Sequence, residues 1–351
     1  MIGTVRTVKP HYRRIATIAV TALLLLVLIV VGNSVQVPYV ALGPGPTINT
    51  LGSLDGKPVV AIEGATTDAT TGHLNLTTVS VNDRLSLFDS LWFWLSRRYT
   101  VEPRELVFPP DQTSEQVQQQ NQQEMSGSES TATAAALRYL KRPTKLVVES
   151  VSASGPSAKV LRPGDQVVRV AGVTVTTTEQ MQSAVRTRKP GQPIAIDIVR
   201  GGAAQTVTVV AAARPDDKSV AYVGVTPEVR NADPALRISY NVGDIGGPSA
   251  GLMLSLAVVD RLSPGELTRG KFIAGTGTIS DDGEVGPIGG ITHKMRAARD
   301  AGATVFLVPA ANCSEALSDT PDGLQLAKVT TINSAISVLD AVSEGKTAPH
   351  C

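Results

Sequence analysis

The stretch "GDIGGPSAGL" (Gly243–Leu252) places a serine, Ser249, at a corner between a strand-like segment and an apolar helix. Two glycines and a proline precede the serine and allow a tight backbone approach at the start of the helix. The first N–H groups of a helix have no partner within it, so they can hold a capping hydroxyl or a developing oxyanion. On spacing alone the sequence favours the capping role. A role as nucleophile requires a base elsewhere in the chain.

A candidate base lies in "GGITHKMRAARDAGA" (Gly289–Ala303), which predicts a helix over about residues 292–301. At ~100° per residue, Lys294 falls on the side of three alanines, whereas His293 falls on the charged side with the arginines. Burial among small apolar side chains lowers the pKa of a lysine, and the neutral amine can act as a general base. The alternative is a lysine that extends past the alanines to solvent. A Ser-His-Asp triad is possible only through His293 or His73.

The composition indicates a globular chain with a membrane-spanning piece: its 351 residues are 42% hydrophobic and 18% charged, with a net charge of +1. The small net charge and the sparse aromatic residues argue against nucleic acid as a partner. The segment "GELTRGKF" (Gly265–Phe272) matches seven positions of a phosphate-binding loop, but Phe272 stands where a magnesium-holding Ser or Thr is needed. No metal-binding motif such as His-Glu-x-x-His occurs. We therefore expect no ATP, no metal and no other cofactor.

The only two cysteines, Cys313 and Cys351, are too few for a metal-ligand cluster. An even number of cysteines permits a disulfide in an oxidising compartment. The alternative, two unrelated thiols, stays open on the sequence alone.

A run without charged residues, "IATIAVTALLLLVLIVV" (Ile15–Val31), predicts a transmembrane helix, and residues 32–35 can extend it to about 30 Å. Four basic residues precede the run, and the next one is Lys57. Basic flanks stay in the cytoplasm, so we expect a cytoplasmic N-terminus and all later domains outside. A cleaved signal peptide is the alternative; the length of the run and the lack of a small-x-small cleavage site favour a retained anchor.

Residues 36–110 predict strands and turns, among them a strand at His73–Val81, where apolar and polar residues alternate. Ser86–Tyr99 predicts an amphipathic helix. One side of this helix holds Phe88, Leu91, Trp92 and Leu95. Core packing is the favoured explanation of that side, and contact with the membrane surface is the alternative. Gln112–Leu140 predicts a helix with a possible break at Gly127, or else a flexible linker.

Residues Lys145–Ala213 predict a strand, a turn with a short helix, a second strand pair, a helix begun by a threonine, and a hairpin. The segments "SGPSAKVLRPGD" and "VAGVTV" resemble a bacterial PDZ domain over about seventy residues. PDZ folds bind an extended peptide at a sheet edge. The resemblance implies a peptide-binding edge at Leu146, Val147 and Val148, although "LKRPTKL" departs from the family's Gly-rich carboxylate loop. The alternative is a PDZ-like fold that serves only as a spacer.

The motifs "GGPSAG" and "DGEVGPIGGITHK" resemble the proteolytic domain of Lon-type proteases, as does "AARDAGATVFLVPAANCSE", over about a hundred residues. The resemblance implies that Ser249 is the nucleophile, Lys294 its base and Thr276 a supporting residue that orients the lysine. It also implies a homo-oligomer. The backbone N–H groups of Ser249 and Ala250 are the expected oxyanion donors. Asp244 lies further upstream than the family's acidic residue, so we assign it no role.

The whole arrangement resembles the membrane-anchored, PDZ-containing Lon-like serine proteases of Gram-positive bacteria. It predicts an α+β multidomain chain with one transmembrane helix, a mixed α/β N-terminal region, a β-rich PDZ-like domain and a C-terminal Lon-type α/β domain. The expected bounds are 1–14 for the cytoplasmic N-terminus, 15–34 for the helix, 35–142 for the extracytoplasmic N-terminal region with its Gln-rich helix, 143–213 for the PDZ-like domain and 214–345 for the proteolytic domain.

This arrangement predicts an ATP-independent Ser-Lys endopeptidase, held in the cell membrane, that cleaves unfolded or flexible polypeptides outside the cytoplasmic membrane. The PDZ domain is expected to recruit or gate the substrate. The alternative is a non-catalytic, membrane-tethered scaffold that binds peptides and carries a degenerate Lon-like domain.

Overall fold

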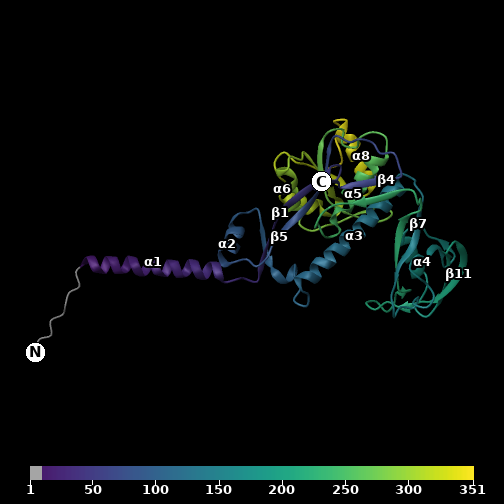
Figure 1. Ribbon diagram of the computed structural model, residues 1–351, viewed down its shortest axis with the longest axis horizontal. Coiled ribbons are helices and arrows are strands. Elements are labelled where there is room, and N and C mark those ends of the chain that lie inside the picture. The colour runs from purple at the N-terminus through teal and green to yellow at the C-terminus, as the bar shows by residue number, and fades with distance from the viewer. Residues whose placement is uncertain (1–9) are drawn as a thin grey trace, which may run out of the picture. The chain divides into compact units, whose positions relative to one another are not determined.

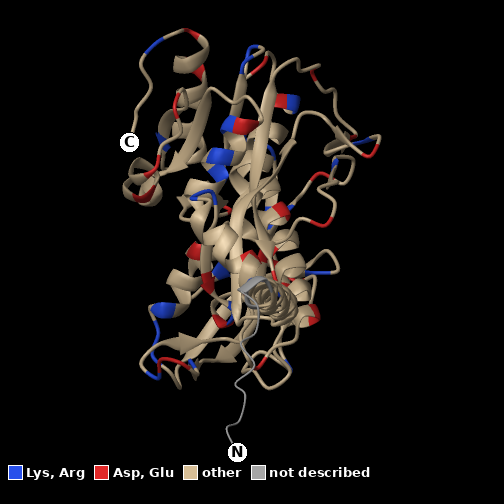
Figure 2. Cartoon of the chain, turned by 90° about the vertical axis from the view of Figure 1, so that its left-hand side faces the viewer, with Lys and Arg blue, Asp and Glu red and all other residues tan. Residues whose placement is uncertain are grey.

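The computed structural model describes residues 10–351, which divide into two compact units (Figure 1). The first unit comprises Met1–Pro44 and Val79–Val117, and the second comprises Gly45–Thr78 and Gln118–Cys351. Both units contain helices as well as strands, in keeping with the predicted α+β class. Blue and red residues are interspersed in the view of Figure 2, in keeping with a net charge of +1. The basic residues at positions 6 and 9 of the predicted cytoplasmic segment lie outside the described residues.

A long apolar helix opens the first unit. This helix, α1, runs from Pro10 to Ser34, and its 21-residue part Arg14–Ser34 is long and apolar enough to cross a membrane. At ~1.5 Å per residue that part measures about 30 Å. The predicted span therefore coincides with a helix, although a signal sequence passes the same test of length and composition.

Short elements complete the first unit. The predicted amphipathic helix is α2 (Leu87–Leu95), and Ser86 caps it. The Asp89 N–H donates to Ser86 Oγ (3.1 Å), and the Ser86 N–H donates to Asp89 Oδ2 (3.0 Å). These reciprocal bonds form a capping box, which fixes where the helix begins. The strand β6 (Thr100–Pro103) pairs antiparallel with the start of β1 (Tyr39–Asn49), and a 3-10 turn, η1 (Arg104–Leu106), follows it.

The Gln-rich segment is one continuous helix, α3 (Ser114–Tyr139), so the linker alternative is wrong. Gly127 does not break it, because a single glycine costs only about 1 kcal/mol in a helix interior. The C-terminal half of the helix is rich in alanine, and Ala132 and Ala134–Leu137 are buried. These small residues allow α3 to pack closely against the second unit's core.

One sheet of the second unit holds the segments that lead into the candidate site. Its strands run in the order β20-β19-β16-β5-β1, and β16 pairs in parallel with both β5 and β19. The strands are β5 (His73–Asn82), β16 (Phe272–Gly275), β19 (Val305–Pro309) and β20 (Gln325–Val329). Strand β5 belongs to the region expected to stand apart at 35–142, so that region shares its sheet with the C-terminal part. The predicted His73–Val81 strand is confirmed as β5.

Helices and small strand pairs surround this sheet. Helix α5 is buried from Gly251 to Asp260, because its surface is almost continuously apolar. The other helices are α6 (Ile291–Asp300), α7 (Cys313–Ser318) and α8 (Ile332–Ser343), and α5 itself is Gly251–Leu262. The strand pairs are β4 (Val60–Glu63) with β15 (Arg237–Tyr240), β17 (Thr278–Ile279) with β18 (Val285–Gly286), and β2 (Ser53–Leu54) with β3 (Lys57–Pro58).

A second sheet, also in the second unit, has the strand order β11-β10-β8-β7-β14. Its strands are β7 (Thr144–Val151), β8 (Gln166–Val170), β10 (Pro193–Arg200), β11 (Ala203–Val210) and β14 (Val225–Asn231), with β9 (Val173–Thr174) attached to β8. Helix α4 (Thr178–Arg186) packs beside it, and the Thr177 side chain caps that helix as predicted. A small pair, β12 (Ala212–Ala213) with β13 (Ala221–Tyr222), precedes β14.

Three expectations about this sheet are wrong. The predicted edge at Leu146–Val148 lies in β7, which β8 and β14 flank on both sides, so this strand offers no free edge to a peptide. The expected boundary after residue 213 excludes β14, which nevertheless pairs with β7. The "SGPSAKVLRPGD" segment (154–165) forms turns and contains no helix. The first two errors share a cause, because strand pairing between distant segments leaves no local signal.

The structure joins Cys313 and Cys351 in a disulfide, as the pairing hypothesis expected. The bond links residues 38 apart in sequence and constrains the unfolded chain, which is worth about 4 kcal/mol in the chain-entropy model. The segment before Cys351 lies along the outer strand of the sheet: the Lys328 N–H donates to Pro349 O (2.9 Å), and Ala327 bridges to His350. The disulfide therefore holds this segment against β20.

Candidate active site

Ser249 lies in a 3-10 turn, Pro248–Ala250, directly before α5. The turn follows Gly247, whose φ of 88° lies in the left-handed region that favours glycine. The Gly247 N–H donates to Asn121 O (2.8 Å), and Ser128 Oγ donates to Pro248 O (3.1 Å). Helix α3, which carries Asn121 and Ser128, therefore holds the corner in place. The sequence did not indicate this role for α3.

The expectation that Ser249 caps the helix is wrong. The N-cap residue of α5 is Ala250, and neither the turn nor α5 has a side-chain cap. The Ser249 hydroxyl instead meets the side chain of Lys294, whose Nζ donates to Ser249 Oγ across 2.7 Å. Ser249 is half-buried and lines an open pocket.

Lys294 reaches the serine from α6, which follows Gly290, a residue in the left-handed conformation (φ 67°). Only 4% of the lysine is exposed, as the helical phase predicted. His293 is buried as well, at 5% exposure, so the expectation that it points outward with the arginines is wrong. The buried part of α6 covers more of its circumference than expected. The buried residues are Ile291, His293, Lys294, Met295, Ala297 and Ala298.

Thr276 connects the side chain of Lys294 to the backbone of Ser249. It follows strand β16, is fully buried, and its Oγ1 accepts a hydrogen bond from Lys294 Nζ (3.0 Å). The same hydroxyl donates to Ser249 O (3.1 Å), and the Gly277 N–H donates to that carbonyl as well (2.9 Å). Because the single proton of Thr276 goes to the carbonyl, its oxygen can only accept from the lysine. This arrangement fixes where the amine points.

Burial lowers the pKa of Lys294 from 10.5 to about 8. Among residues 10–351 no carboxylate forms an ion pair with this lysine, so no opposite charge offsets the cost of removing its charge from water. A substantial fraction of the amine is therefore neutral near pH 8. A neutral amine within hydrogen-bonding distance of a hydroxyl can accept its proton.

The other histidine considered for a triad, His73, lies away from this cluster along the sheet. It pairs with Phe272 at the start of β16, stacks on that ring, and its Nδ1 contacts Asn49 Nδ2 (3.4 Å). Thr276 follows the opposite end of β16, which is about 10 Å further on at ~3.3 Å per residue. His73 is therefore too far from the Thr276 end of β16 to meet Ser249.

A pocket of about 380 Å³ opens beside Ser249, mostly lined by apolar atoms. Its lining residues are Pro248, Ser249, Thr278, Pro287, Ile288 and Gly289. They come from the serine turn, from β17 and from the segment between β18 and α6. The pocket has the size and polarity to take a side chain next to a bond under attack.

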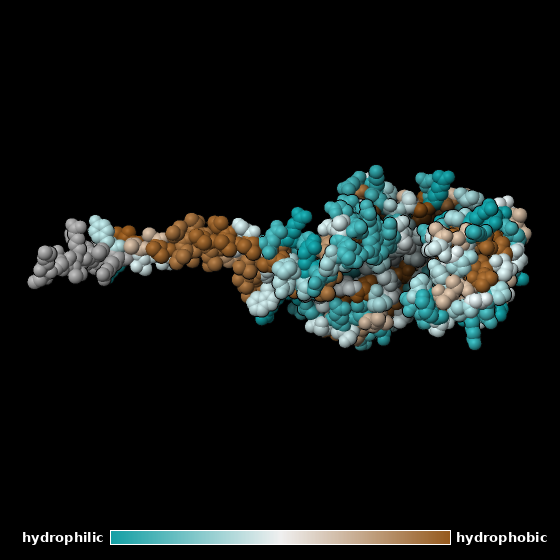
Figure 3. Space-filling view, turned by 90° about the horizontal axis from the view of Figure 1, so that it is seen from below, coloured by the Kyte–Doolittle hydropathy of each residue, from teal (hydrophilic) through white to brown (hydrophobic). Residues whose placement is uncertain are grey.

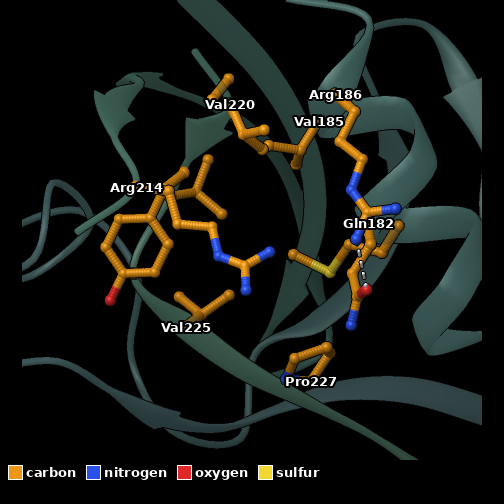
Figure 4. A pocket seen from close by; sticks show the side chains of 12 residues that line it. Gln182, Val185, Arg186, Arg214, Val220, Val225 and Pro227 are labelled. Atoms are coloured by element: carbon orange, nitrogen blue, oxygen red, sulfur yellow. Dashed lines mark hydrogen bonds between the residues drawn. The ribbon is translucent and has the colours of Figure 1, made fainter. Parts of the chain in front are cut away.

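A second pocket, of about 390 Å³, lies between α4 and the segment Val220–Pro227 (Figure 4). We call it the α4–β14 groove. Gln182, Val185 and Arg186 form one wall from α4, and Figure 4 shows Arg214 reaching towards the middle. The groove adjoins β14, which ends the strand order of the second sheet.

Sequence reasoning missed this groove, because it placed the peptide edge in β7. The signal was present in "YVGV" (Tyr222–Val225), a hydrophobic-Gly-hydrophobic pattern directly before a strand. Gly224 has a φ of 75°, which is typical of a glycine required by a tight turn.

Two family models match this chain. Residues 238–343 match the Lon protease (S16) C-terminal proteolytic domain, and residues 116–210 match the PDZ domain. The chain carries a Lon-type proteolytic domain preceded by a PDZ domain, together with one N-terminal helix apolar enough to span a membrane. The strand β14 lies beyond the PDZ match.

Curated relatives agree with the C-terminal match. The chain is 31% identical over 131 residues to Lon protease of Mycolicibacterium smegmatis (36% of this chain, 16% of that protein). It is 28% identical over 143 residues to Lon protease 2 of Bacillus subtilis (40% and 25%), and 31% identical over 98 residues to Archaeal Lon protease of Halobacterium salinarum (27% and 14%). The chain thus spans a quarter or less of the length of these relatives.

Among solved structures, the PDZ domain of the SdrC-like protein from Listeria monocytogenes is similar, with 19% identity and a TM-score of 0.22. That similarity covers 24% of this chain and 86% of the Listeria domain.

Proposed function

We propose that this chain is a serine endopeptidase in which Ser249 is the nucleophile and Lys294 the general base. The observation that supports it most is the 2.7 Å contact between Ser249 Oγ and a lysine amine that is 4% exposed. Burial of the amine and its direct contact with the hydroxyl are the two conditions that a Ser-Lys pair requires.

The reaction begins when Ser249 Oγ bonds to the substrate's carbonyl carbon and its proton passes to Lys294 Nζ. The carbonyl oxygen takes the displaced electron pair, and the backbone N–H groups of Ser249 and Ala250 stabilise the oxyanion. When the carbon–nitrogen bond breaks, Lys294 returns the proton to the leaving amine. Water then attacks the acyl-enzyme, with Lys294 again accepting a proton, and the serine hydroxyl is restored. Thr276 acts as a positioning residue for the amine.

The preferred substrates are unfolded or flexible polypeptides, cleaved without ATP. The test is degradation of an unfolded protein, such as reduced casein, by the purified chain with and without ATP and magnesium. We expect equal rates in both conditions. ATP-stimulated degradation contradicts ATP independence, whereas absence of cleavage and of labelling by a serine-directed fluorophosphonate favours the rival function, a non-catalytic tethered scaffold.

The rate of hydrolysis is expected to rise with pH through an apparent pKa near 8, because burial lowers the pKa of Lys294 to about 8. Below that pH the ammonium form cannot accept a proton, so kcat/KM falls about 10-fold per pH unit. The measurement is kcat/KM for a fluorogenic peptide across this range, at constant ionic strength. A rate that is flat or falls as the pH rises through 8 argues against a lysine base.

The α4–β14 groove is the proposed site where the PDZ domain binds substrate. Two arginines, Arg186 and Arg214, line it, so it favours a peptide with a carboxylate at or near its end. Arg214 forms an exposed ion pair with Asp216 (2.8 Å), which the peptide carboxylate has to replace. Helix α4 also contacts the protease domain, since the Thr178 N–H donates to Asp281 Oδ2 (2.8 Å) in the segment between β17 and β18. This contact supports a role in gating as well as in recruitment.

Replacing Arg214 by Gln is expected to weaken peptide binding about 5-fold, because one charge-assisted hydrogen bond contributes about 1 kcal/mol or more. The assay is fluorescence anisotropy of a labelled peptide with a free C-terminus, in a Ser249→Ala background that prevents cleavage. The matched control is Arg169→Gln, since Arg169 is an exposed arginine in β8 outside the groove. Equal affinities of both variants contradict the assignment of the groove.

The proposed location is the cell membrane, with α1 as a retained anchor and both domains outside the cytoplasm. The basic residues before α1 support a cytoplasmic N-terminus. The Cys313–Cys351 disulfide supports an oxidising compartment for the C-terminal domain. A homo-oligomer remains a proposal from the resemblance to Lon-type domains.

A further inference from the structure

Helix α2 exposes most of its large apolar side chains. None of its residues is buried, so the expectation that its apolar side packs in a core is wrong. A cluster of exposed apolar side chains on a short helix indicates a surface that contacts a membrane or another protein. The exposed residues are Leu87 (49%), Leu91 (50%), Trp92 (70%), Trp94 (69%) and Leu95 (61%).

The apolar residues form one continuous surface on α2. Leu87, Leu91 and Leu95 are four residues apart and make a single stripe along the helix. Trp94 lies three residues from Leu91, and Trp92 lies three residues from Leu95, so the two indoles flank the stripe. The polar residues of the helix, Asp89 and Ser90, are occupied with the capping turn at Ser86.

Contacts within the first unit fix α2 beside the C-terminal end of α1. Gly32, in the last turn of α1, faces the Phe88 ring, and a Cβ built on Gly32 would lie 2.3 Å from it. The Val37 N–H donates to Leu85 O (2.9 Å), and Gln36 bridges to Ser86. The segment that leaves the candidate span therefore pairs with the segment that enters α2. In Figure 3 the apolar surface of α1 continues onto residues at this end.

This position matters because the last turn of a membrane-spanning helix lies at the boundary between hydrocarbon and headgroups. Tryptophan is enriched at that depth, where its ring is buried while its N–H stays hydrated. A short amphipathic helix held at the same level meets the bilayer with its apolar stripe. The two tryptophans of the chain, Trp92 and Trp94, both lie in this helix.

We propose that α2 lies in the outer interface of the bilayer that α1 crosses, with Trp92, Trp94 and the leucine stripe inserted among the headgroups and upper acyl chains. The protein then holds the membrane by two contacts, one across it and one along its surface. This inference rests on the proposed anchoring by α1. It assigns the stripe to lipid rather than to a second copy of the chain.

Intrinsic fluorescence tests the inference directly, because every tryptophan signal of the chain comes from α2. The full chain is reconstituted into vesicles of phosphatidylcholine and phosphatidylglycerol, with or without lipids brominated near the top of the acyl chains. We expect a blue-shifted emission and its loss in brominated vesicles. Aqueous iodide should quench the protein much less than it quenches N-acetyltryptophanamide. Trp92→Phe and Trp94→Phe, each leaving one indole, should both retain quenching by lipid.

The outcomes separate this inference from the anchoring on which it rests. Flotation with the vesicles, combined with iodide quenching and no effect of bromine, overturns the inference and leaves the anchor intact. Flotation with protection from both quenchers also overturns it, because the indoles are then covered by protein, as in a second copy. Failure to float with the vesicles overturns both the anchor and the inference.

Discussion

Replacement of Ser249 by Ala is expected to lower kcat/KM for an unfolded peptide substrate by at least about 1,000-fold, since loss of the nucleophile removes the covalent route altogether. The fold should not change, because the hydroxyl caps no helix and its hydrogen bond is to the side chain of Lys294. The measurement is hydrolysis of a fluorogenic peptide, with circular dichroism and Tm to verify folding.

Variants of the neighbouring residues serve as controls. Lys294→Ala should lose as much activity as Ser249→Ala, because nucleophile and base act as one unit. Thr276→Val should lower kcat with little change in KM, and Thr276→Ser should restore the rate, since only the hydroxyl is required to position the amine. His293→Ala should retain most activity. Full activity of folded Ser249→Ala would refute the Ser-Lys assignment. A loss of activity in folded His293→Ala as large as that expected for Ser249→Ala would refute it as well.

Replacement of Lys294 by Met is expected to abolish activity and yet to stabilise the fold by about 3 kcal/mol at pH 7. The pKa of this lysine is about 8 in the folded state, whereas the ordinary value of 10.5 applies to the unfolded state. Below pH 8 both states bind the proton, and the folded state bears the full cost of a buried charge. Methionine has a similar length and no charge, so it removes that cost.

The gain should depend on pH in a defined direction. Between about pH 8 and 10.5 the unfolded wild type still binds a proton that the folded state has released, so wild-type stability rises with pH in this window. Above that window the wild type and Lys294→Met should converge. Urea unfolding followed by far-ultraviolet circular dichroism, at pH values on both sides of the window, measures the difference. A variant less stable than the wild type at pH 7 would show that the amine's hydrogen bonds outweigh its desolvation.

Short-range features of the sequence indicated two parts of the candidate site, whereas the roles of nucleophile and base followed from the resemblance to Lon-type proteases. The Gly-Gly-Pro corner placed Ser249 directly before an apolar helix, and the structure has it there. The helical phase of residues 292–301 predicted that Lys294 is buried, and it is. The phase could not show how much of α6 is covered. His293 is buried, as are Met295 and Ala298 of the same helix, which belong to a hydrophobic cluster.

Long-range pairing was beyond the reach of the same reasoning. Strand β14 pairs with β7 across more than seventy residues of chain, and β5 pairs with β16 across almost two hundred. No periodicity within a segment specifies its neighbours in a sheet, so the peptide edge was placed on the wrong strand. The apolar stripe of α2 was interpreted as core for a related reason, since a hydrophobic pattern shows that a face is covered but not by what.

The disulfide near the end of the chain has a consequence for how the protein must mature. While Cys313 and Cys351 are bonded, the segment at 348–350 is held beside β20 by a bridge from His350 to Ala327. Breaking the bond allows this segment to move away from β20. The unpaired backbone N–H and C=O groups of β20 are then exposed, and such an edge can pair with a strand of another molecule. A newly synthesised chain in a reducing compartment therefore has an edge of β20 that is prone to aggregation, and formation of the disulfide protects this edge.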